Sequence, residues 1–532
     1  MKQNSSYDYY EVPKIQNLQE LIKLHKDSSR PAFTWQSGGQ NQRRSYKAVY
    51  EDVSNLAKFF ASKYSGKHIA VIGENSYAWI AYSLAIAISG NVCVAIDKDG
   101  SIDTIKKQLK QCDVKTICYS ESYNEEVGKL SNDTYSFEEL HEIIDRGAKE
   151  KKKTPSINDD QVAMIFFTSG TTGYSKAVVL SHKNIASDLY GAASIFNPFG
   201  NACSFLPYHH AFGYVTSALN PYYYGITTFI SSSFKHLVND FQVSKPSTIF
   251  VVPMVIETIY KQIWREARRQ HNEHFLKIAL GLNRGFLKLN IDFRDKIFKQ
   301  IHQQLGGNLK YIICGGAPLG TEYIKWFRNI GIEVLNGYGI TECSPVVSVN
   351  RNEYHRDGSI GQIVRGAEVS IIDGEIAVKG DIVMKGYYKD KKATAETLRN
   401  GYYFTGDLGY VDEDGFLFIT GRKKNLIILS NGENVSPEEI ESELKKDKGV
   451  DEVIVYEYGN RIVASIFPNE GYLGDQDYFD DIIYKYNQDK AKNRQIAMVR
   501  LRDTAFPRNN NGKIVRSKLI EEDNLWKMRS LI

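Results

Sequence analysis

The chain has 532 residues, of which 42% are hydrophobic and 24% are charged, and its formal net charge is +4. This length exceeds what a single hydrophobic core usually serves, so we expect at least two domains. The composition is typical of a soluble globular protein, and the small net charge argues against nucleic-acid binding. The six cysteines are scattered without a Cys-x-x-Cys pair. That pattern indicates reduced thiols and neither a disulfide framework nor a zinc site.

The N-terminal half contains one segment that could be taken for a membrane span. Residues Asn75–Ile96 carry no charge over more than the ~20 residues that a transmembrane helix needs. Ser89, Gly90 and Asn91 interrupt the segment, however, and a β-rich stretch follows. The pattern therefore predicts a buried helix followed by a buried parallel strand. The polar N-terminus lacks the apolar core of a signal peptide, and we expect a cytoplasmic protein without a transmembrane segment.

Short apolar runs that end in turn residues alternate with segments of helical periodicity through the first two thirds of the chain. The runs are His68–Asn75, Val162–Gly170, Thr248–Pro253, Leu309–Gly316 and Ile332–Gly339. This alternation predicts an α/β fold with parallel strands, in which ligands bind beyond the carboxyl ends of the strands. The lysine-rich residues 148–156 are expected to form a solvated linker.

After about Gly358 the pattern changes to short strands separated by turns. Asp373-Gly374 and Asp414-Gly415 predict hairpins and hence an antiparallel sheet. Further along, Ser436 is expected to cap a helix, with Glu439 completing a capping box. The remainder is short and mixed, with two strands that we expect to meet at a turn of residues 459–460.

The stretch Thr168–Lys176 (TSGTTGYSK) combines glycines, hydroxyls and a lysine between two apolar runs. Glycines let backbone N–H groups approach an anion, hydroxyls add donors, and the lysine adds positive charge. The stretch does not match the P-loop of nucleoside triphosphatases, because Tyr174 and Ser175 separate Gly173 from the lysine. Taken alone, it is equally compatible with a phosphate-binding loop and with a polar turn.

The same stretch resembles the phosphate-binding loop of the adenylate-forming (ANL) superfamily, although members often have Pro where Ser175 stands and Gly where Ala177 stands. Further motifs follow in the order that this family shows. They are LPYHHAFGY (Leu206–Tyr214), CGGAPL (Cys314–Leu319), NGYGITE (Asn336–Glu342), YFTGD (Tyr403–Asp407), GRKKN (Gly421–Asn425), SNGENVSPEEIE (Ser430–Glu441) and PRNNNGKIVR (Pro507–Arg516). The chain is identified as a member on this ordered set, and it most resembles the fatty acyl-CoA synthetase branch.

The resemblance implies a large adenylation domain at residues 1–422, built from two α/β subdomains with parallel-rich sheets and a small antiparallel β-barrel. A hinge at residues 423–426, centred on Lys424, would lead to a small mobile α+β lid domain at residues 427–532. The implied reaction joins a carboxylic acid to ATP, giving acyl-AMP and pyrophosphate, before a thiol attacks the acyl-adenylate. Rotation at the hinge would exchange the catalytic Lys513 for the loop around Gly432, past which the thiol enters.

The resemblance also implies roles for individual residues. Phosphate would be bound by Thr168, Ser169, Gly170, Thr171, Thr172, Gly173 and Lys176. Adenine and ribose would be bound by Gly316, Ala317, Pro318, Asn336, Gly337, Tyr338, Gly339, Asp407 and Arg422. Catalysis would fall to Lys513, Glu342, Thr341 and His210. Mg²⁺ would be held by Glu342 and Thr168, because a few oxygen ligands completed by phosphate and water suit this ion.

Outside the family context, these polar residues would be interpreted differently. Lys513 would be a surface lysine, Asp407 a structural turn residue and Glu342 a solvated carboxylate. The pair His209-His210 lacks the following Asp-Gly of a condensation-domain motif. Adjacent residues of a strand point to opposite faces, so we do not expect this pair to bind zinc. The resemblance gives His210 a binding and positioning role beside the acyl group.

The substrate is narrowed by the charges around the expected acyl pocket. No Asp or Glu occurs between Asp188 and Asp240, so a buried α-ammonium group would have no counter-ion and an amino acid is disfavoured. The surrounding apolar and aromatic residues suit a fatty or aromatic acid. We expect a medium- or long-chain fatty acid–CoA ligase. Two alternatives remain open: a stand-alone acyl or aryl acid ligase that loads the phosphopantetheine of an acyl carrier protein, and a catalytically silent acyl-binding homologue.

Overall fold

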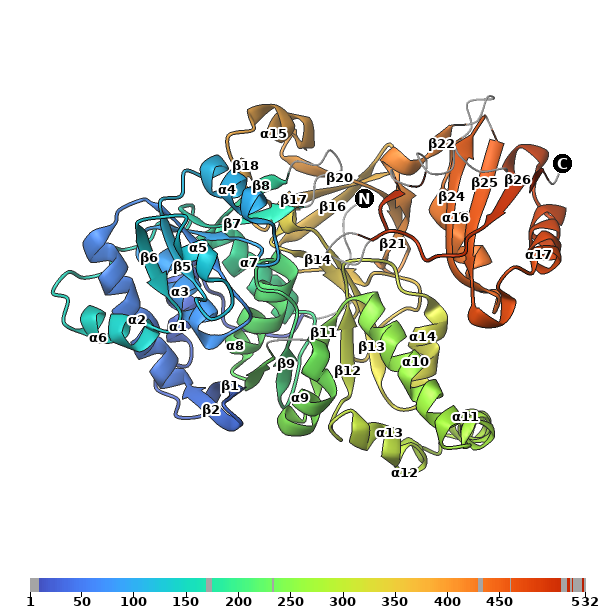
Figure 1. The fold of residues 1–532 in the computed structure, drawn as a ribbon, viewed down its shortest axis with the longest axis horizontal. Coiled ribbons are helices and arrows are strands. Elements are labelled where there is room, and N and C mark those ends of the chain that lie inside the picture. Colours follow the sequence, from blue (N-terminus) through green and yellow to red (C-terminus); the bar gives the residue numbers. More distant parts are fainter. Residues whose placement is uncertain are drawn as a thin grey trace. The chain divides into compact units, whose positions relative to one another are not determined.

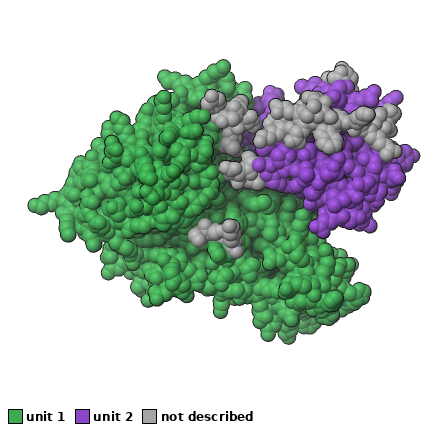
Figure 2. All heavy atoms as spheres, viewed as in Figure 1, with its two compact units in different colours: residues 1–369, 378–404, 413–417 green, residues 370–377, 405–412, 418–532 purple. Residues whose placement is uncertain are grey.

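The computed structural model describes residues 9–168, 175–231, 234–428, 434–459, 461–508, 514–516, 519 and 529–530 (Figure 1). The chain divides into two compact units. Unit 1 comprises residues 1–369, 378–404 and 413–417, and unit 2 comprises residues 370–377, 405–412 and 418–532 (Figure 2). The domain limits expected from the sequence, with a hinge at residues 423–426, stay a prediction.

One sheet of unit 1 has seven strands in the order β18-β8-β7-β4-β3-β5-β6. The strands are β3 (His68–Ile72), β4 (Val92–Ala95), β5 (Thr116–Tyr119), β6 (Asp133–Ser136), β7 (Val162–Thr168), β8 (Lys176–Ser181) and β18 (Gly386–Tyr387). All pairs from β7 to β6 are parallel, whereas β8 runs antiparallel to both of its neighbours. Helices in this part of the chain are α1 (Leu18–Lys23), α2 (Tyr46–Lys63), α3 (Tyr77–Ile88), α4 (Ile102–Gln111), α5 (Glu125–Gly128), α6 (Leu140–Ala148) and α7 (His182–Ala193).

The apolar segment Asn75–Ile96 forms the buried helix and strand that its sequence predicts. Every residue of α3 is buried, and the side chain of Ser76 caps its first turn by accepting from the Trp79 N–H at 3.2 Å. Strand β4 is also fully buried, between β3 and β7. Within the described part of the chain, no helix combines the length and the apolar character that crossing a bilayer demands.

The second sheet of unit 1 has nine strands in the order β15-β14-β13-β12-β11-β9-β10-β1-β2. Its strands are β1 (Pro31–Ser37), β2 (Gln40–Ser45), β9 (Ala202–Ser204), β10 (Thr228–Ile230), β11 (Thr248–Val251), β12 (Tyr311–Cys314), β13 (Glu333–Gly339), β14 (Val346–Val349) and β15 (Gln362–Ile363). The pairs from β1 to β13 are parallel, and β2, β14 and β15 add antiparallel edges. The predicted α/β class is therefore confirmed for both sheets.

Helices of several kinds accompany the nine-stranded sheet. They are the π-helix η1 (Phe212–Leu219), α8 (Asn220–Tyr224), η2 (Phe234–His236), α9 (Leu237–Ser244), α10 (Pro253–Arg269), α11 (Glu273–Lys288), α12 (Arg294–Ile297), α13 (Lys299–Gln304), α14 (Thr321–Asn329) and η3 (Thr341–Cys343). Figure 1 shows α10 to α13 together at one end of unit 1.

An antiparallel half-barrel follows, with strand order β16-β17-β20-β19 and β21 beside β20. Its elements are β16 (Ala367–Ile372), β17 (Glu375–Gly380), α15 (Lys391–Thr397), β19 (Leu398–Arg399), β20 (Tyr402–Val411) and β21 (Leu417–Arg422). Asp373 and Gly374 join β16 to β17 with φ values of +50° and +77°. Two successive positive φ values are what a two-residue hairpin turn requires, so the predicted turn is confirmed.

The C-terminal part of unit 2 is a small α+β fold, as expected. Its sheets have the orders β24-β25-β26-β27 and β22-β23. The elements are η4 (Lys423–Asn425), β22 (Ile427–Ile428), β23 (Asn434–Val435), α16 (Pro437–Leu444), β24 (Val450–Tyr458), β25 (Arg461–Pro468), η5 (Glu470–Tyr472), α17 (Gln476–Gln488), η6 (Lys492–Arg494), β26 (Ile496–Leu501) and β27 (Arg529–Ser530). Phe479 and Ile483 of α17 share one buried cluster with Val455 and Ala464 of the sheet.

The start of α16 corrects one detail of the sequence analysis. The helix begins at Pro437 after Ser436, as predicted, but the Ser436 side chain makes no capping hydrogen bond. Its hydroxyl donates instead to the carbonyl oxygen of Thr420 at 2.7 Å. The predicted capping box with Glu439 is therefore wrong, because a long-range acceptor has taken the hydroxyl that the box needs.

Candidate active site

Strands β7 and β8 carry the two ends of the predicted phosphate-binding loop. They pair antiparallel with Thr168 opposite Lys176, so the sheet brings these two predicted site residues together. The remaining predicted phosphate ligands, Ser169, Gly170, Thr171, Thr172 and Gly173, lie outside the described residues. Their role stays a prediction.

Glu342 lies in the short helix η3 with its side chain turned into the protein, and the residue is only 8% exposed. The hydroxyl of Tyr387 donates to its Oε1 at 2.8 Å. Burial, followed by the charge of Glu342, raises the pKa of Tyr387, which keeps the hydroxyl protonated and able to donate. The carboxylate is therefore oriented by a neutral donor.

Lys176 joins this group through the same tyrosine. Its Nζ lies 4.6 Å from the centre of the Tyr387 ring, within the range of a cation–π interaction. Strand β18 pairs with β8 and places Tyr387 opposite Val178, two residues beyond the lysine. Thus a predicted phosphate ligand and a predicted metal ligand are connected by one aromatic ring.

Sequence reasoning missed Tyr387, although its surroundings held a signal. Gly386 precedes Tyr387 and Tyr388 in a short stretch that lies between two predicted motifs, NGYGITE and YFTGD. No local pattern pairs it with Glu342, which lies 45 residues earlier. Only the pairing of β18 with β8 identifies this tyrosine as part of the candidate site.

The carboxyl ends of β12 and β13 carry the glycine-rich turns predicted to bind adenine. The two strands are parallel, with Cys314 opposite Asn336. Gly316 has a φ of +85°, which favours glycine, and the following Ala317 and Pro318 are exposed. At Gly339 a Cβ atom would lie 1.7 Å from a backbone oxygen, so the turn before Glu342 has no room for a side chain.

The strand β13 itself presents the remaining predicted nucleotide contacts. Asn336 and Gly337 are half-buried, and Tyr338 is 9% exposed. The Nδ2 of Asn336 donates to the Ser359 carbonyl at 3.4 Å, which ties the end of the strand to the chain beyond β14. The partly buried Thr341 follows in η3. The geometry brings these residues to one end of the sheet, and their contacts with a nucleotide stay predictions.

The His209-His210 pair corrects a premise of the sequence analysis. These residues lie in a turn after β9 and not in a strand, and their ring centres are only 4.2 Å apart. The Nε2 of His209 lies 3.4 Å from Oδ1 of Asp97, but burial lowers the pKa of His209 well below its usual range, so the imidazole is neutral. The argument that the rings face opposite ways is therefore wrong, because a turn has no strand alternation.

The turn is packed against the π-helix η1 and the CGGAPL turn. A Cβ atom at Gly213 would lie 2.2 Å from the Pro207 carbonyl oxygen, so only glycine lets the turn fold back this closely. At Gly315 a Cβ atom would lie 3.0 Å from the Phe212 ring. The predicted acyl-binding and adenine-binding segments are therefore in contact. A π-helix is rare and often marks a functional site.

In unit 2, the predicted ribose-binding residues Asp407 and Arg422 form an ion pair. The Nε of Arg422 lies 2.6 Å from Oδ1 of Asp407, which is 2% exposed, on the neighbouring strands β20 and β21. A second pair lies beside it: Lys423 Nζ is 2.8 Å from Oε2 of the buried Glu375, and Oε1 accepts from the Gly406 N–H at 2.9 Å. Sequence reasoning missed Glu375, because it sits in an ordinary hairpin strand.

The predicted hinge residue Lys424 lies in η4, directly after these pairs. Burial, followed by the charge of Arg422, lowers the pKa of Lys424. The predicted catalytic Lys513 and the predicted thiol-channel residue Gly432 lie outside the described residues. The hinge and the lysine exchange therefore stay predictions.

The residues present fit a magnesium ion bound chiefly by substrate oxygens. Among the described residues, no group of three or more His, Cys, Asp or Glu side chains could hold a metal ion. Glu342, however, offers a buried carboxylate with Thr168 as a second predicted oxygen ligand, and Mg²⁺ commonly uses one or two protein oxygens plus phosphates and water. The donor set matches an ion that arrives with a nucleotide.

Comparison with known proteins decides the family. The AMP-binding enzyme family matches residues 23–388, and the AMP-binding enzyme C-terminal domain matches residues 424–522. The chain belongs to the AMP-binding enzyme family. Because the first match covers well over half of the chain, the expected membership of the adenylate-forming superfamily, in its acyl-CoA synthetase branch, is confirmed.

Individual members of the AMP-binding family are similar over most of the chain. The long-chain-fatty-acid–CoA ligase FadD15 of Mycobacterium bovis is 28% identical over 426 residues, which are 74% of this chain and 71% of that protein. Crystal structures give the same fold. ATP-bound MatB of Rhodopseudomonas palustris has a TM-score of 0.78 at 23% identity, covering 96% of this chain and 100% of that one. The anthranilate CoA ligase AuaEII with anthranoyl-AMP has a TM-score of 0.77 at 16% identity, covering 98% and 99%.

Family membership gives the site its chemistry. The protein is an AMP-forming enzyme of the acyl-CoA synthetase branch, and it uses ATP to activate a carboxylic acid. The six cysteines are free and buried. Burial raises the pKa of the Cys314 thiol, next to the turn predicted to bind adenine, which disfavours a thiolate nucleophile there.

Proposed function

We propose that this AMP-binding enzyme is a fatty acid–CoA ligase that acts on medium- or long-chain acids. The observation that carries the proposal is the uncharged segment of residues 189–231, which includes η1 and contains no Asp, Glu, Lys or Arg. Seven of the eight residues of η1 are buried. An uncharged segment beside the acyl group would suit an alkyl chain, whose burial is favourable by about 0.8 kcal/mol per CH₂ group. The similarity to a long-chain-fatty-acid–CoA ligase supports the same class.

Asp188, the acidic residue that directly precedes the uncharged segment, does not supply a counter-ion for an amino-acid substrate. Asp188 is 1% exposed, and its Oδ1 accepts from the Val346 N–H at 2.6 Å. Burial raises the pKa of Asp188 well above its usual range, which favours the neutral carboxyl group. A neutral, buried group cannot balance an ammonium ion, which argues against amino acids.

In this proposal the described residues bind and orient the reactants. Thr168 and Lys176 would bind the β- and γ-phosphates, and Glu342 with Thr168 would hold Mg²⁺. When bound, the ion offsets phosphate charge. Tyr338 would stack on adenine between the turns of Gly316–Pro318 and Gly337–Gly339. His210 would position the carboxylate, Thr341 would contact phosphate, and Asp407, held by Arg422, would accept from the ribose hydroxyls.

Lys513 would approach the carboxylate and the α-phosphate during adenylation. A positioned cation of this kind is typically worth about 3–4 kcal/mol in the transition state, or roughly 10²–10³ in rate. We expect Lys513→Ala to reduce pyrophosphate exchange by this factor while thioester formation from supplied acyl-adenylate is spared. If Lys513→Ala reduced adenylation and thioester formation equally, the result would contradict the proposal that the lid domain rotates about Lys424 between one position for each half-reaction.

The identity of the carboxylic acid substrate is tested by supplying fatty, aryl and amino acids in turn and trapping the acyl-adenylates with hydroxylamine. We expect fatty acids of medium or long chain to give the highest kcat/KM, at least tenfold above aryl and amino acids. Preference for an aryl acid would overturn the fatty-acid proposal but leave adenylation intact. No pyrophosphate release with any acid would instead support a silent acyl-binding homologue.

The acceptor is tested separately by adding CoA or a phosphopantetheine-loaded acyl carrier protein to the same assay. We propose CoA, because it is the usual acceptor in this branch. Faster turnover with the carrier protein would favour the stand-alone carrier-protein ligase. The cytoplasmic location expected from the sequence stays a prediction, which fractionation of cells would check.

A further inference from the structure

Helix α11 presents a row of apolar side chains to solvent. Phe275 is 69% exposed, Ile278 47% and Leu282 58%, and Leu289, at the C-cap of the helix, is 70% exposed. Their spacing of three, four and seven residues places them on one side of the helix. A contiguous exposed apolar row is unusual for a surface and marks an interaction site more often than single exposed residues do.

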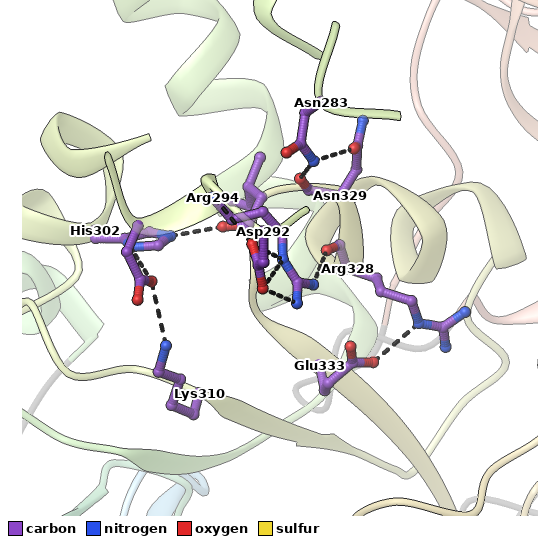
Figure 3. A network of polar contacts seen from close by, with 10 residues as sticks. Asn283, Asp292, Arg294, His302, Lys310, Arg328, Asn329 and Glu333 are labelled. Atoms are coloured by element: carbon purple, nitrogen blue, oxygen red, sulfur yellow. Dashed lines mark hydrogen bonds and ion pairs between the residues drawn. The ribbon is translucent and has the colours of Figure 1, made fainter. Parts of the chain in front are cut away.

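The opposite side of α11 is already used to attach the helix to unit 1. Leu276, Ala279 and Leu280 are buried. The buried Asn283 donates from Nδ2 to the carbonyl oxygen and to Oδ1 of Asn329 in α14, at 2.7 and 2.8 Å (Figure 3). The rotation of α11 is therefore fixed, and its exposed apolar row cannot be the side that packs on the protein.

The chain after α11 is held in place by a polar network. Arg294 Nη2 is 2.7 Å from Asp292, and Arg294 Nη1 donates to the Arg328 carbonyl at 3.0 Å (Figure 3). Between and beside these anchors, Ile291 and Phe293 are each 40% exposed. The network thus holds a second apolar group at the surface, close in sequence to the end of the row.

Basic residues are concentrated in the segment that contains α11, from the second half of α10 to the start of α13. Residues 261–299 contain ten Lys and Arg against four Asp and Glu, a surplus of six, while the whole chain has a net charge of only +4. The rest of the protein is therefore net negative, at −2 by difference. Nine of the ten basic residues are exposed: Lys261, Arg265, Arg268, Arg269, Lys277, Arg284, Lys288, Lys296 and Lys299.

Local ion pairs do not cancel this surplus. Glu266 contacts Arg269 at 2.7 Å, and Glu273 contacts Lys277 at 2.8 Å and Arg268 at 3.6 Å. These acids are already counted in the charge balance. The segment therefore combines a positive field with an exposed apolar row.

We propose that α11 and its flanking residues dock on the surface of an anionic lipid bilayer. Apolar side chains of an in-plane helix enter the boundary between headgroups and acyl chains, while Lys and Arg contact lipid phosphates. Positive segments gain affinity for anionic lipid with each basic residue near the surface. An acidic protein would complement the positive charge of this surface but not its apolar row. A second copy of this chain would bring another apolar row, but its segment carries the same positive charge and would be repelled. The inference does not depend on which acid the enzyme activates.

The first test uses the full chain and a variant of the apolar row. Phe275→Ser, Ile278→Ser and Leu282→Ser are combined, and flotation with vesicles of phosphatidylglycerol and phosphatidylcholine is measured. We expect at least a tenfold lower partition coefficient than for the natural sequence. The matched control is Leu473→Ser with Tyr484→Ser, two exposed apolar residues of unit 2, which should bind as the natural sequence does. Equal flotation of the row variant, or no flotation of the natural sequence, overturns the proposal.

The second test addresses the basic residues. Arg284→Gln with Lys288→Gln should lower the partition coefficient severalfold, and binding should weaken in high salt or on pure phosphatidylcholine vesicles, because both remove the electrostatic attraction. Unchanged binding on neutral vesicles contradicts the anionic partner. A dimer in sedimentation analysis that the row variant abolishes would assign the surface to a second copy instead. Adenylation of a water-soluble acid without vesicles should be unaffected in all these variants, which separates this result from the proposed function.

Discussion

Two buried carboxylates, one in each unit, have different kinds of partner. Glu342 in unit 1 accepts a hydrogen bond from Tyr387, and among the described residues it has no ion pair; its nearest cation in the cluster, Lys176, lies over the tyrosine ring. Asp407 in unit 2 contacts the guanidinium of Arg422 directly. A buried carboxylate without a contacting cation retains its attraction for an incoming metal ion, whereas one paired with arginine is an acceptor for neutral hydroxyls.

Because Glu342 has no contacting cation among the described residues, we expect Glu342→Gln to have the largest effect on catalysis. Glutamine keeps an oxygen for the Tyr387 hydroxyl but removes the negative charge, so we expect kcat/KM to fall about 10²–10³-fold, in line with losing about 3–4 kcal/mol of electrostatic stabilisation. Pyrophosphate exchange at several Mg²⁺ concentrations measures this loss. The exposed Glu396→Gln serves as control. Full activity of Glu342→Gln at ordinary Mg²⁺ would remove the metal from this site.

Asp407→Asn should affect ATP binding and stability together. Removing the charge leaves Arg422 without its partner, although this arginine is 43% exposed and water compensates it in part. We expect a loss of about 2 kcal/mol in the free energy of unfolding and about a tenfold rise in the KM for ATP. Thermal unfolding and initial rates measure both, with the exposed Asp489→Asn as control. A change in stability alone would make the pair purely structural.

Tyr387→Phe isolates the hydroxyl group in the Glu342 cluster. The ring that faces Lys176 remains, but one hydrogen bond to a charged group is lost, which is worth about 1.5–2 kcal/mol, or a roughly tenfold to thirtyfold fall in kcat/KM. The neighbouring Tyr388→Phe is the control, because its hydroxyl donates to Asp113. Identical effects of the two variants would show that the hydroxyl of Tyr387 does not orient the carboxylate.

Asp188→Asn should have the smallest effect on activity, within about threefold, because burial raises the pKa of this carboxyl group and favours its neutral form in the folded protein. Above pH 4 the unfolded chain releases the Asp188 proton while the folded chain keeps it, so this group makes the free energy of unfolding fall as pH rises. The variant lacks that contribution. Thermal unfolding from pH 4.5 to 7.5 should therefore decline less steeply with pH for Asp188→Asn. Parallel curves would contradict a raised pKa.

The sequence allowed much of unit 1 to be predicted. The five apolar runs became β3, β7, β11, β12 and β13, because a buried parallel strand is a continuous apolar run that ends in a turn. The segment Asn75–Ile96 was predicted to be a buried helix and a buried strand, because it is likewise a continuous apolar run interrupted by turn residues. The histidine turn was misassigned as a strand, because its fold depends on Gly213 lying against Pro207 and not on local alternation.

The residues of the candidate site likewise fall into those that stand in a sequence motif and those that only the packing of distant strands reveals. The resemblance to the family gave Glu342, Lys176, Asp407 and Arg422 as predicted site residues, since each stands in one of the local motifs that carry the resemblance. Tyr387 was missed, because only the packing of distant strands gives it a partner. The capping box at Ser436 failed because a distant carbonyl competed for its hydroxyl.

By itself the sequence determined the α/β class and the family, since periodicity and motif spacing are properties of neighbouring residues. The tertiary structure alone decided which charges meet. It put Tyr387 on Glu342 and Lys423 on Glu375, and it turned one side of α11 outward. The physical reason is that burial and register act between residues far apart in the chain, where no local pattern records the partner.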